Sequence, residues 1–447
     1  MPPVLDRRLR GPLLLYSLAW WLATPALLGS LVWRGARQRG YLFAVPERFG
    51  FVPMPPAARQ LIWVHAVSVG ETRAAEPLIR ALASRWPAAQ ILLTHMTPTG
   101  RDTGRTVLAD LVQSGRLRQA WLPWDYPGAT RRMLTRLRPT IGVLMETELW
   151  PNLMAAATDL RVPIVLASAR LSERSLAKGL RWRSLIGPAL DALDRVFAQT
   201  PSDAGRLARL GRDAVPVFGN LKFDIEAPAA MLARGALWRE CLLSSKASRG
   251  IILAASTRDG EEAMLLEAWQ RLRQSWPEAT RPLLVLVPRH PQRFDEVAEL
   301  ARSGRWSLIR RSAFGSEGPD PQAAQADLIL GDSMGEMFAW YALADVAIIG
   351  GSLAPLGGQN LIEAAAVGCP VLLGPHTFNF EEISRDAIEA GAALRVGDAA
   401  GALHAAEALL RDEPRRSRMS ELALAFARQH RGATQRTVDA IADLIPD

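Results

Sequence analysis

The chain has 447 residues, of which 49% are hydrophobic and 22% are charged, and its net charge is +8. It is too long for one ordinary hydrophobic core, so we expect two domains and an additional segment. The basic balance fits nucleic acid, anionic lipid, or phosphorylated and carboxylated small molecules as partners. No RNP, zinc-finger or basic-zipper pattern is present, so nucleic acid ranks last. Cys241 and Cys369 match no metal-binding spacing and are expected to be reduced core residues of a cytoplasmic domain.

The N-terminal segment carries no charged residue from Gly11 to Trp33. At the helical rise of about 1.5 Å per residue this run can cross a bilayer core of about 30 Å. Trp20, Trp21 and Trp33 are of the type that settles at the lipid–water boundary. We expect a membrane-anchor helix within residues 1–38. A signal peptide and an interfacial or core helix remain alternatives, and arginines on both sides leave the orientation open.

A basic connector rich in proline and glycine, Arg34 to Arg59, leads into alternating strands and helices. Short apolar runs bounded by polar, glycine or proline residues predict buried strands, and amphipathic stretches such as Ala74–Trp86 and Ala129–Leu137 predict helices. This alternation indicates a parallel sheet with crossover helices in a first domain, residues 39–222. The predicted strands are Leu61–Val67, Gln90–Met96, Thr140–Met145, Pro163–Ala167, Arg195–Gln199 and Val215–Gly219.

A stretch of mixed helix and polar loop, Phe223 to Arg249, precedes a second set of strands in residues 223–447. Helices again fall between the strands, and one of the last helices is expected to cross back to the first domain. Two successive sheets of this kind imply a cleft, with ligands beyond the carboxyl ends of the strands. The predicted strands are Ile251–Ala255, Leu283–Pro288, Asp327–Leu330, Asp345–Gly350 and Pro370–Leu373.

The segment Trp63–Glu71 ends the first predicted strand and opens a helix near Glu71. Gly70 would permit a tight turn and the close approach of a ligand to the backbone. Glu71 would then stand at a helix N-terminus. The alternative is that Glu71 only complements the helix dipole, an effect of about 0.3–1 kcal/mol.

Two carboxylates, Glu146 and Glu148, follow the strand that ends at Met145. At strand spacing they would point the same way, so one should have a raised pKa or meet a cation. The alternative is a solvated turn before a helix started by Pro151.

Cationic residues stand near the ends of other predicted strands. Lys222 lies among apolar residues at the junction between the halves, where it could hold an anion or extend to the surface. Arg289 directly follows a strongly apolar strand and suits bidentate phosphate binding. His290 is equally a ligand contact or a polar turn residue.

A glycine-rich segment runs from Gly350 to Glu363 between a strand and a helix. Backbone N–H groups there could receive a nucleotide phosphate. Alternatively, Asn360 is an N-cap and Glu363, three residues on, completes a capping-box-like arrangement. The pattern is neither Gly-x-Gly-x-x-Gly nor a Walker loop, which counts against dinucleotide enzymes and ATPases.

In this order, the segments resemble those of the Kdo (3-deoxy-D-manno-octulosonic acid) transferases that glycosylate the lipid A precursor. The resemblance covers nearly the whole chain. Further matching segments are Pro46–Gly50, Met96–Gly100, Leu122–Asp125, Glu146–Asn152, Ser168–Ser172, Gly219–Asp224, Leu286–Pro291, Gly331–Glu336 and Gly374–Phe380.

The resemblance implies a GT-B fold, in which two Rossmann-like domains face a central cleft, with the acceptor on the first and CMP-Kdo on the second. It implies an inverting transfer without metal or cofactor, in which Glu71 is the general base and Glu146 and Lys222 stabilise the transition state. It also implies lipid IVA as acceptor, the inner membrane as location with the catalytic domains on its cytoplasmic face, and no protein partner. The residues implied for the CMP site are Arg289, His290, Met334, Gly335, Glu336, Asn360, Leu361, Ile362 and Glu363.

One departure from the family pattern is Arg258, where histidine is expected after Thr257. It puts a local contact near the donor in doubt. A rival interpretation is a GT-B enzyme that uses a UDP-sugar, either a cell-wall glycosyltransferase or a sugar-nucleotide epimerase. Another is a membrane scaffold that has kept the fold without catalysis, against which the presence of Glu71, Arg289 and Glu363 speaks.

Overall fold

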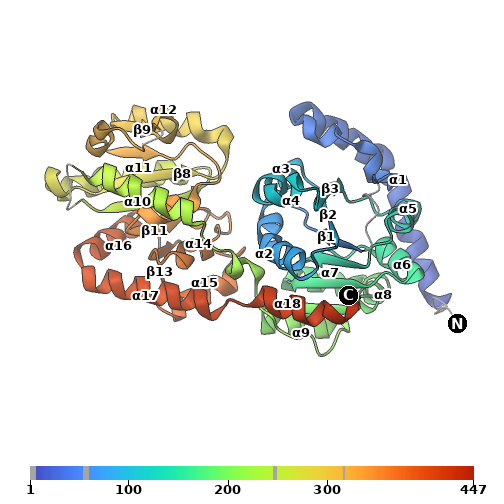
Figure 1. Cartoon of the computed structure of the whole chain (residues 1–447). Helices are drawn as coiled ribbons and strands as arrows, with labels where there is room; N and C mark the ends of the chain where they lie inside the picture. The colour runs from blue at the N-terminus through green and yellow to red at the C-terminus, as the bar shows by residue number, and fades with distance from the viewer. Residues whose placement is uncertain (1–6, 54–59, 245–248, 316–317, 447) are drawn as a thin grey trace. The chain divides into compact units, whose positions relative to one another are not determined.

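The structure of the chain is a computed structural model that describes residues 7–53, 60–244, 249–315 and 318–446 (Figure 1). The end of the predicted basic connector, residues 54–59, lies outside the described residues, as do residues 1–6 and 245–248. The chain forms two compact units. The first unit consists of Met1–Ile225 and Arg431–Asp447, and the second of Glu226–His430.

The first unit is built on a six-stranded parallel sheet in the order β3-β2-β1-β4-β5-β6. Alternate residues of β1 face opposite sides, with Leu61 and Trp63 in one apolar cluster and Ile62 and Val64 in the other. Both faces of the sheet are therefore covered, which explains why its strands read as continuous apolar runs. The strands are β1 (Leu61–His65), β2 (Gln90–His95), β3 (Leu117–Trp121), β4 (Ile141–Met145), β5 (Ile164–Ala169) and β6 (Arg195–Ala198).

Helices alternate with these strands, as the sequence predicted. The helix that contains the predicted stretch Ala74–Trp86 begins at Val69, close to the predicted opening near Glu71, and the Ser68 side chain caps it by accepting the N–H of Glu71. The helices are α2 (Val69–Arg85), α3 (Pro98–Val107), α4 (Ala109–Gln113), α5 (Pro127–Leu137), α6 (Pro151–Leu160), α7 (Glu173–Arg181), α8 (Arg183–Asp191) and α9 (Pro201–Leu210), with the 3-10 turns η1 (Arg39–Leu42), η2 (Val45–Phe49) and η3 (Leu221–Asp224).

The strands of this unit differ from the sequence prediction at two places. Strand β3 was missed, because its sequence Leu-Arg-Gln-Ala-Trp mixes charged and apolar residues at the edge of the sheet. The predicted strand Val215–Gly219 forms only an isolated bridge, in which Val217 pairs with Ala198. Pro216 has no N–H to donate, and Gly219 turns away with a φ of 94°.

The second unit holds a seven-stranded parallel sheet in the order β13-β12-β11-β7-β8-β10-β9. The five predicted strands are present, and two short edge strands, β9 and β13, were not predicted. The strands are β7 (Ile251–Thr257), β8 (Leu283–Pro288), β9 (Leu308–Arg310), β10 (Leu328–Leu330), β11 (Val346–Ile349), β12 (Val371–Leu373) and β13 (Ala393–Arg395).

Helices cover this sheet as well, and α11 and α16 pack with Ile252 and Ala254 of β7 in one apolar core. The helices are α10 (Ala229–Leu243), α11 (Glu261–Leu272), α12 (Phe294–Ser303), α13 (Met337–Leu343), α14 (Ile362–Ala366), α15 (Glu381–Glu389), α16 (Ala399–Arg411) and α17 (Glu413–Gln429), with the 3-10 turns η4 (Arg273–Ser275), η5 (Glu278–Thr280), η6 (Pro291–Arg293), η7 (Arg311–Ala313) and η8 (Pro321–Gln325). Cys241 is half-buried, Cys369 is buried, and both are free thiols.

The long N-terminal helix α1 (Arg7–Arg37) contains, among the described residues, the one segment long and apolar enough to cross a membrane, Gly11–Arg37. One stripe of this helix is docked on the first unit. The Ser17 hydroxyl donates to the Asn152 side chain at 3.0 Å, Thr24 and Tyr126 share a hydrogen bond of 2.7 Å, and Leu31 is buried. Ser17, Thr24 and Leu31 are seven residues apart, which is about two helical turns, so they lie on one face of the helix.

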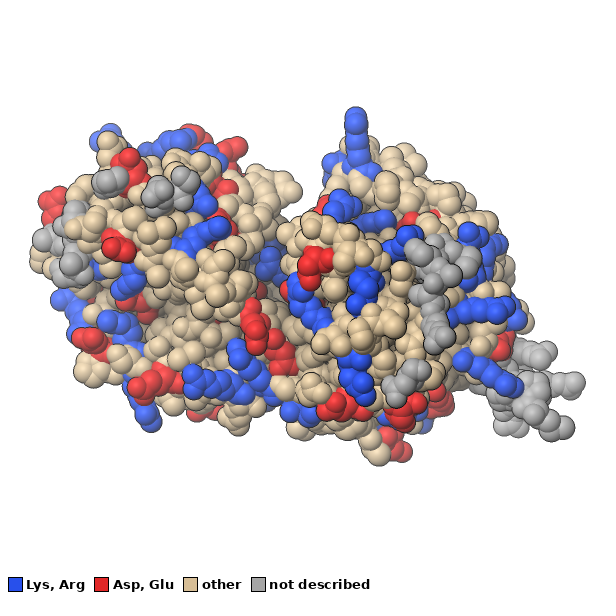
Figure 2. Space-filling view, in the orientation of Figure 1, with Lys and Arg blue, Asp and Glu red and all other residues tan. Residues whose placement is uncertain are grey.

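The opposite face of α1 exposes large apolar side chains, among them Leu14, Leu18, Trp21 and Leu22. In water such a contiguous face would be costly, so its surroundings are expected to be apolar. A separate question is whether basic side chains form a patch that could also bind a membrane surface. Figure 2 shows Lys and Arg scattered among acidic residues on both units, rather than gathered in one patch.

The C-terminal helix α18 (Ala433–Ile441), followed by the 3-10 turn η9 (Ala442–Leu444), belongs to the first unit and packs against α2 (Figure 1). Its start is fixed by Asp224, whose carboxylate oxygens accept the N–H groups of Gly432 and Thr434, each at 2.6 Å. A carboxylate in this position satisfies N–H groups that the helix itself leaves unpaired.

Replacing Asp224 by Ala should lower the free energy of unfolding of the first unit by about 1–2 kcal/mol, because two helix N–H groups lose a charged acceptor. Hydrogen exchange of residues 431–446 measures the effect locally. Asp213→Ala, which removes an exposed carboxylate, is the control and should leave the exchange unchanged. Equal hydrogen-exchange protection of residues 431–446 in the two variants would contradict the role of Asp224 at the start of α18.

Candidate active site

The strand order of the first sheet reverses between β1 and β4, which are neighbours in the sheet but not in sequence. In open parallel sheets the crevice at such a reversal, beyond the carboxyl ends of the strands, is where ligands bind. Glu71 follows β1 and Glu146 follows β4. The topology therefore places two of the predicted catalytic residues at this reversal.

Glu71 lies in the first turn of α2, and its carboxylate is held from the preceding residues. One oxygen accepts the Val67 N–H at 2.9 Å, and the other accepts the Ser68 hydroxyl at 3.1 Å. Ser68 is the N-cap and Glu71 stands three residues on, as in a capping box, but the Glu71 carboxylate accepts the N–H of Val67 instead of that of the N-cap residue. The sequence Ser68-Val-Gly-Glu71 has the spacing of such a cap, so the structural role of Glu71 goes beyond the predicted interaction with the helix dipole.

Burial raises the pKa of Glu71 to about 7, even though the hydrogen bond from Val67 favours the ionised form. The charges of Glu146 and Glu148 raise this pKa further, while His65 lowers it. A carboxylate that titrates close to neutral pH can both accept and release a proton there, which is what general acid–base chemistry requires.

Glu146 is paired with Lys222, whose ammonium group donates to it at 2.8 Å, and both side chains are mostly buried. The prediction that one of the two carboxylates meets a cation is thus correct. The strand-spacing argument behind it was wrong, because β4 ends at Met145 and Glu146 adopts a left-handed turn with a φ of 56°.

Glu148 lies apart from this ion pair and accepts the Trp150 indole N–H at 2.8 Å. Its carboxylate is also 3.7 Å from Nε2 of the fully buried His65. Glu148 thus lies among buried groups and not in a solvated turn. Lys222, through its ion pair with Glu146, is a partly buried member of the same cluster and not an extended surface lysine.

Gly70 lies in the first helical turn of α2 and not in a tight turn, so the conformational reason given for it was wrong. It is exposed, and a Cβ added there would find no atom nearer than the Ser68 hydroxyl at 4.0 Å. The missing side chain therefore leaves open surface directly beside Glu71.

The second sheet has its own order reversal, between β7 and β11. The glycine-rich segment follows β11, at the edge where such sheets bind ligands. Gly350 is required by the neighbouring strand, because a Cβ there would lie 2.3 Å from the Ser256 carbonyl oxygen. Gly351 has a φ of 69°, which glycine adopts without strain.

Glu261, the first residue of α11, is fully buried and contacts the backbone of this segment. Its carboxylate accepts backbone N–H groups of Gly351 at 2.6 Å, Leu353 at 3.0 Å and Ala354 at 3.2 Å. The N–H of Arg258 donates to it as well, at 2.9 Å. One buried carboxylate thus connects the two sides of the reversal, a role that sequence reasoning missed.

Two signals for Glu261 were available in the sequence. It comes shortly after a predicted strand, and it is the first residue of a helix whose N-cap is Gly260. Acidic residues are common in the first turn of helices. Nothing local to residues 258–262, however, indicates that its partners lie about 90 residues further along the chain.

The residues Asn360, Leu361, Ile362 and Glu363 lead into the short helix α14. The Asn360 side chain accepts the N–H of Ile362 at 3.0 Å and donates to the Glu363 carboxylate at 3.3 Å. Leu361, not Asn360, occupies the N-cap position, so the predicted capping box is replaced by this local pair.

Met334, Gly335 and Glu336 lie between β10 and α13. Met334 is 53% exposed, whereas Glu336 is buried between Arg311 and Arg234, at 2.9 and 2.8 Å. Burial is the largest single effect and opposes ionisation of Glu336, but the hydrogen bonds from Arg311 and Ser333 and the charges of Arg311 and Arg234 together lower the pKa of this carboxyl. Glu336 is therefore a structural carboxylate that fixes the loop carrying Met334.

Arg289 and His290 directly follow β8. His290 is exposed, and its pKa is lowered by desolvation and then by the charges of Arg258 and Arg289. Arg258, the departure from the family pattern, thus contributes positive charge to the same edge. Within the described parts of the chain, no group of three His, Cys, Asp or Glu side chains is arranged to hold a metal ion.

The raised pKa of Glu71 has a consequence for stability. The folded chain binds the proton more tightly than the unfolded chain, whose pKa is about 4.5, so stability falls as the pH rises from about 4.5 through about 7. Glu71→Gln has no charge to bury, so this loss is absent. Between pH 5 and pH 8 the free energy of unfolding of the parent should therefore fall by roughly 1–3 kcal/mol more than that of the variant. Thermal unfolding of both proteins at the two pH values measures it, and Glu173→Gln on the exposed face of α7 is the control. The same pH dependence in parent and Glu71→Gln would contradict the burial of this charge.

Glu261→Gln should destabilise the second unit by about 2–4 kcal/mol, because several buried N–H groups then face an amide with one acceptor. Glu267→Gln on the same helix changes an exposed carboxylate that pairs with the exposed Arg271, and should cost less than about 0.5 kcal/mol. Equal melting temperatures for the two variants would show that Glu261 does not hold the loop.

The chain matches a family model described as 3-deoxy-D-manno-octulosonic-acid transferase (kdotransferase) over residues 44–225. It is 50% identical over 419 residues to the 3-deoxy-D-manno-octulosonic acid transferase of Bordetella pertussis, covering 92% of this chain and 95% of that protein. It is 36% identical to the enzyme of the same name from Haemophilus influenzae, covering 90% of this chain and 91% of that protein.

Two solved structures share the two-domain fold at low sequence identity, and they support the fold alone. The first is S. aureus MnaA with UDP, which is 18% identical with a TM-score of 0.55 and covers 87% of this chain and 98% of that one. The second is a UDP-GlcNAc 2-epimerase from Neisseria meningitidis, which is 13% identical with a TM-score of 0.56 and covers 86% of this chain and all of that one. Two parallel-sheet Rossmann-like units, GT-B-like neighbours and the extent of the identity together establish that this chain belongs to the Kdo transferase family of GT-B glycosyltransferases.

Proposed function

We propose that the chain transfers Kdo from CMP-Kdo to the lipid A precursor, lipid IVA, with inversion at the anomeric carbon and without a metal ion. Family membership supports Kdo transfer. The observation that carries the mechanism is a carboxylate with a pKa of about 7 at the order reversal of the first sheet. In this proposal the first unit binds the acceptor and the second unit binds the donor.

Glu71 is the general base in this proposal. It removes the proton from the acceptor's primary hydroxyl as that oxygen attacks the anomeric carbon of Kdo, and the bond to CMP breaks. Such assistance typically contributes 10²–10⁴-fold in rate. The open surface at Gly70 gives the acceptor sugar room to approach the carboxylate.

The Glu146–Lys222 pair stabilises the transition state in this proposal. The ammonium group of Lys222 partly offsets the charge of Glu146, which otherwise raises the pKa of Glu71. The pair also offers a fixed dipole whose orientation costs no reorganisation during the reaction. The hydrogen bond of 2.8 Å and the burial of both side chains support such a fixed geometry.

The second unit binds CMP-Kdo in this proposal, through Arg289, His290, Met334, Gly335, Glu336, Asn360, Leu361, Ile362 and Glu363. These residues follow β8, β10 and β11, whose carboxyl ends share one edge of the sheet. Arginine charge and backbone N–H groups there can stabilise the departing phosphate without a metal. Glu336 acts through the loop that it fixes, since its own carboxylate is held by two arginines.

Helix α1 attaches the chain to the cytoplasmic face of the inner membrane in this proposal. Its length, its apolar composition and its exposed face of leucine and tryptophan side chains support this. Lipid IVA resides in that membrane, whereas CMP-Kdo is soluble, so an enzyme held at the surface has access to both.

Glu71→Gln should leave CMP binding within twofold of the parent and reduce Kdo transfer at least 10²-fold, because the amide cannot accept the proton. In the parent, transfer should rise with pH through about 7 as Glu71 ionises. Calorimetry with CMP, and with UDP as the control nucleotide, measures binding, and the mass of the lipid product measures transfer. Near-normal turnover by Glu71→Gln would remove it from this role, and a preference for UDP would refute the donor.

A further inference from the structure

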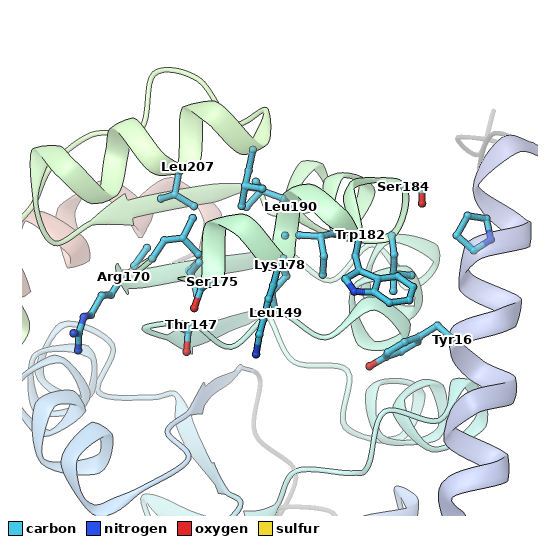
Figure 3. Close-up of a pocket in the computed structure, with 18 of the residues that line it drawn as sticks. Tyr16, Thr147, Leu149, Arg170, Ser175, Lys178, Trp182, Ser184, Leu190 and Leu207 are labelled. Carbon is cyan, nitrogen blue, oxygen red and sulfur yellow. The ribbon is translucent and has the colours of Figure 1, made fainter. Parts of the chain in front are cut away.

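An apolar cavity of about 800 Å³ lies in the first unit, next to the turn that carries Glu146 (Figure 3). Its volume falls within the range of about 300–1,000 Å³ typical of small-molecule sites. Helix α1 forms one wall, and α7, α8 and α9 form others. The apolar residues that line it include Leu15, Leu149, Leu171, Leu185, Ile186 and Leu190.

Polar groups gather at one side of this cavity. In Figure 3 the side-chain nitrogen atoms of Lys178 and Arg170 lie on the same side as the Thr147 hydroxyl, whereas Leu190 and Leu207 lie on the opposite side. Among the residues that the structure describes, neither cation forms an ion pair with a carboxylate. Two cations beside an apolar cavity are complementary to an amphipathic anion.

We propose that this cavity holds an acyl chain of the acceptor lipid, with a phosphate of the same molecule at Lys178 and Arg170. This inference rests on the proposed function and specifies how the acceptor is recognised. Glu146 lines the cavity, so a lipid bound there has its polar end beside the proposed reaction centre. An ordinary membrane phospholipid in the same place would occupy the position that the acceptor sugar needs.

The position of α1 supports an occupant that comes from the membrane. Pro12, Leu15 and Ala19 of this helix line the cavity. Leu15 is itself 70% exposed, and Leu14, Leu18 and Leu22 are exposed beside it, so this wall also faces the surroundings of α1. An acyl chain can thus move from the apolar surroundings of α1 into the cavity along one helix. Each methylene that becomes buried strengthens binding roughly fourfold, so a cavity of this size can discriminate acylated from deacylated acceptors.

The first test reduces the volume of the cavity by a substitution in its lining. Leu185→Trp places a large side chain among the lining residues, and Leu180→Trp, the control, introduces the same residue on α7 outside the cavity. KM is measured with the full chain in detergent for lipid IVA and for its deacylated sugar phosphate. Leu185→Trp should raise the ratio of the KM for lipid IVA to that for the deacylated acceptor about tenfold, and Leu180→Trp should leave this ratio unchanged. An unchanged ratio in both variants would overturn the inference.

A second measurement uses the unmodified chain and so does not depend on the folding of a variant. Lipid IVA with a diazirine at the end of an acyl chain should label peptides from residues 171–190. Labelling confined to α1, or labelling of 171–190 by a diazirine phospholipid that excess lipid IVA does not reduce, would overturn the inference. If the unmodified chain transfers no Kdo to lipid IVA, the proposed function itself fails; transfer with an unchanged KM ratio counts against the cavity alone.

Discussion

The parallel pairing of strands that are distant in sequence is the constraint on which both candidate sites depend. Because β1 pairs with β4, and β7 with β11, the loops after these strands leave each sheet side by side. One pairing brings Glu71 next to Glu146, and the other brings Glu261 under the glycine-rich segment. Neither set of contacts exists in the unpaired segments, so the chemistry of each unit depends on the register of one strand pair.

The carboxylates of these sites do different work, and their surroundings explain the difference. Glu261 accepts several backbone N–H groups in a fully buried position and serves to hold the loop. Glu336 is neutralised by two arginines. Glu71 accepts from the Val67 N–H and the Ser68 hydroxyl, which do not offset its desolvation cost, so its pKa lies close to neutral pH. Burial without full compensation is a physical characteristic of a group that exchanges protons.

Much of this arrangement was predictable from the sequence, because strong apolar runs such as Leu283–Pro288 identify buried parallel strands directly. The edge strands β3, β9 and β13 were not predictable, since they are short, mixed in polarity and defined by their neighbours. The motifs around Glu71, Glu146 and Lys222 were recognisable, but the ion pair between residues 146 and 222 depends on tertiary structure. Likewise, no sequence period showed that α1 would dock on Asn152 and Tyr126 through polar side chains.

Under the proposed function, that docking determines how a membrane lipid and a soluble nucleotide meet. A domain on a loose tether would sample many heights above a bilayer, but Ser17 and Thr24 join α1 to the body of the first unit by buried or partly buried hydrogen bonds. In the proposed membrane setting, the turn after β4 is therefore kept at one depth while the protein diffuses in the plane of the bilayer. In the proposed setting, one substrate is found by a two-dimensional search and the other by diffusion in three dimensions, with no vertical excursion of the enzyme between them.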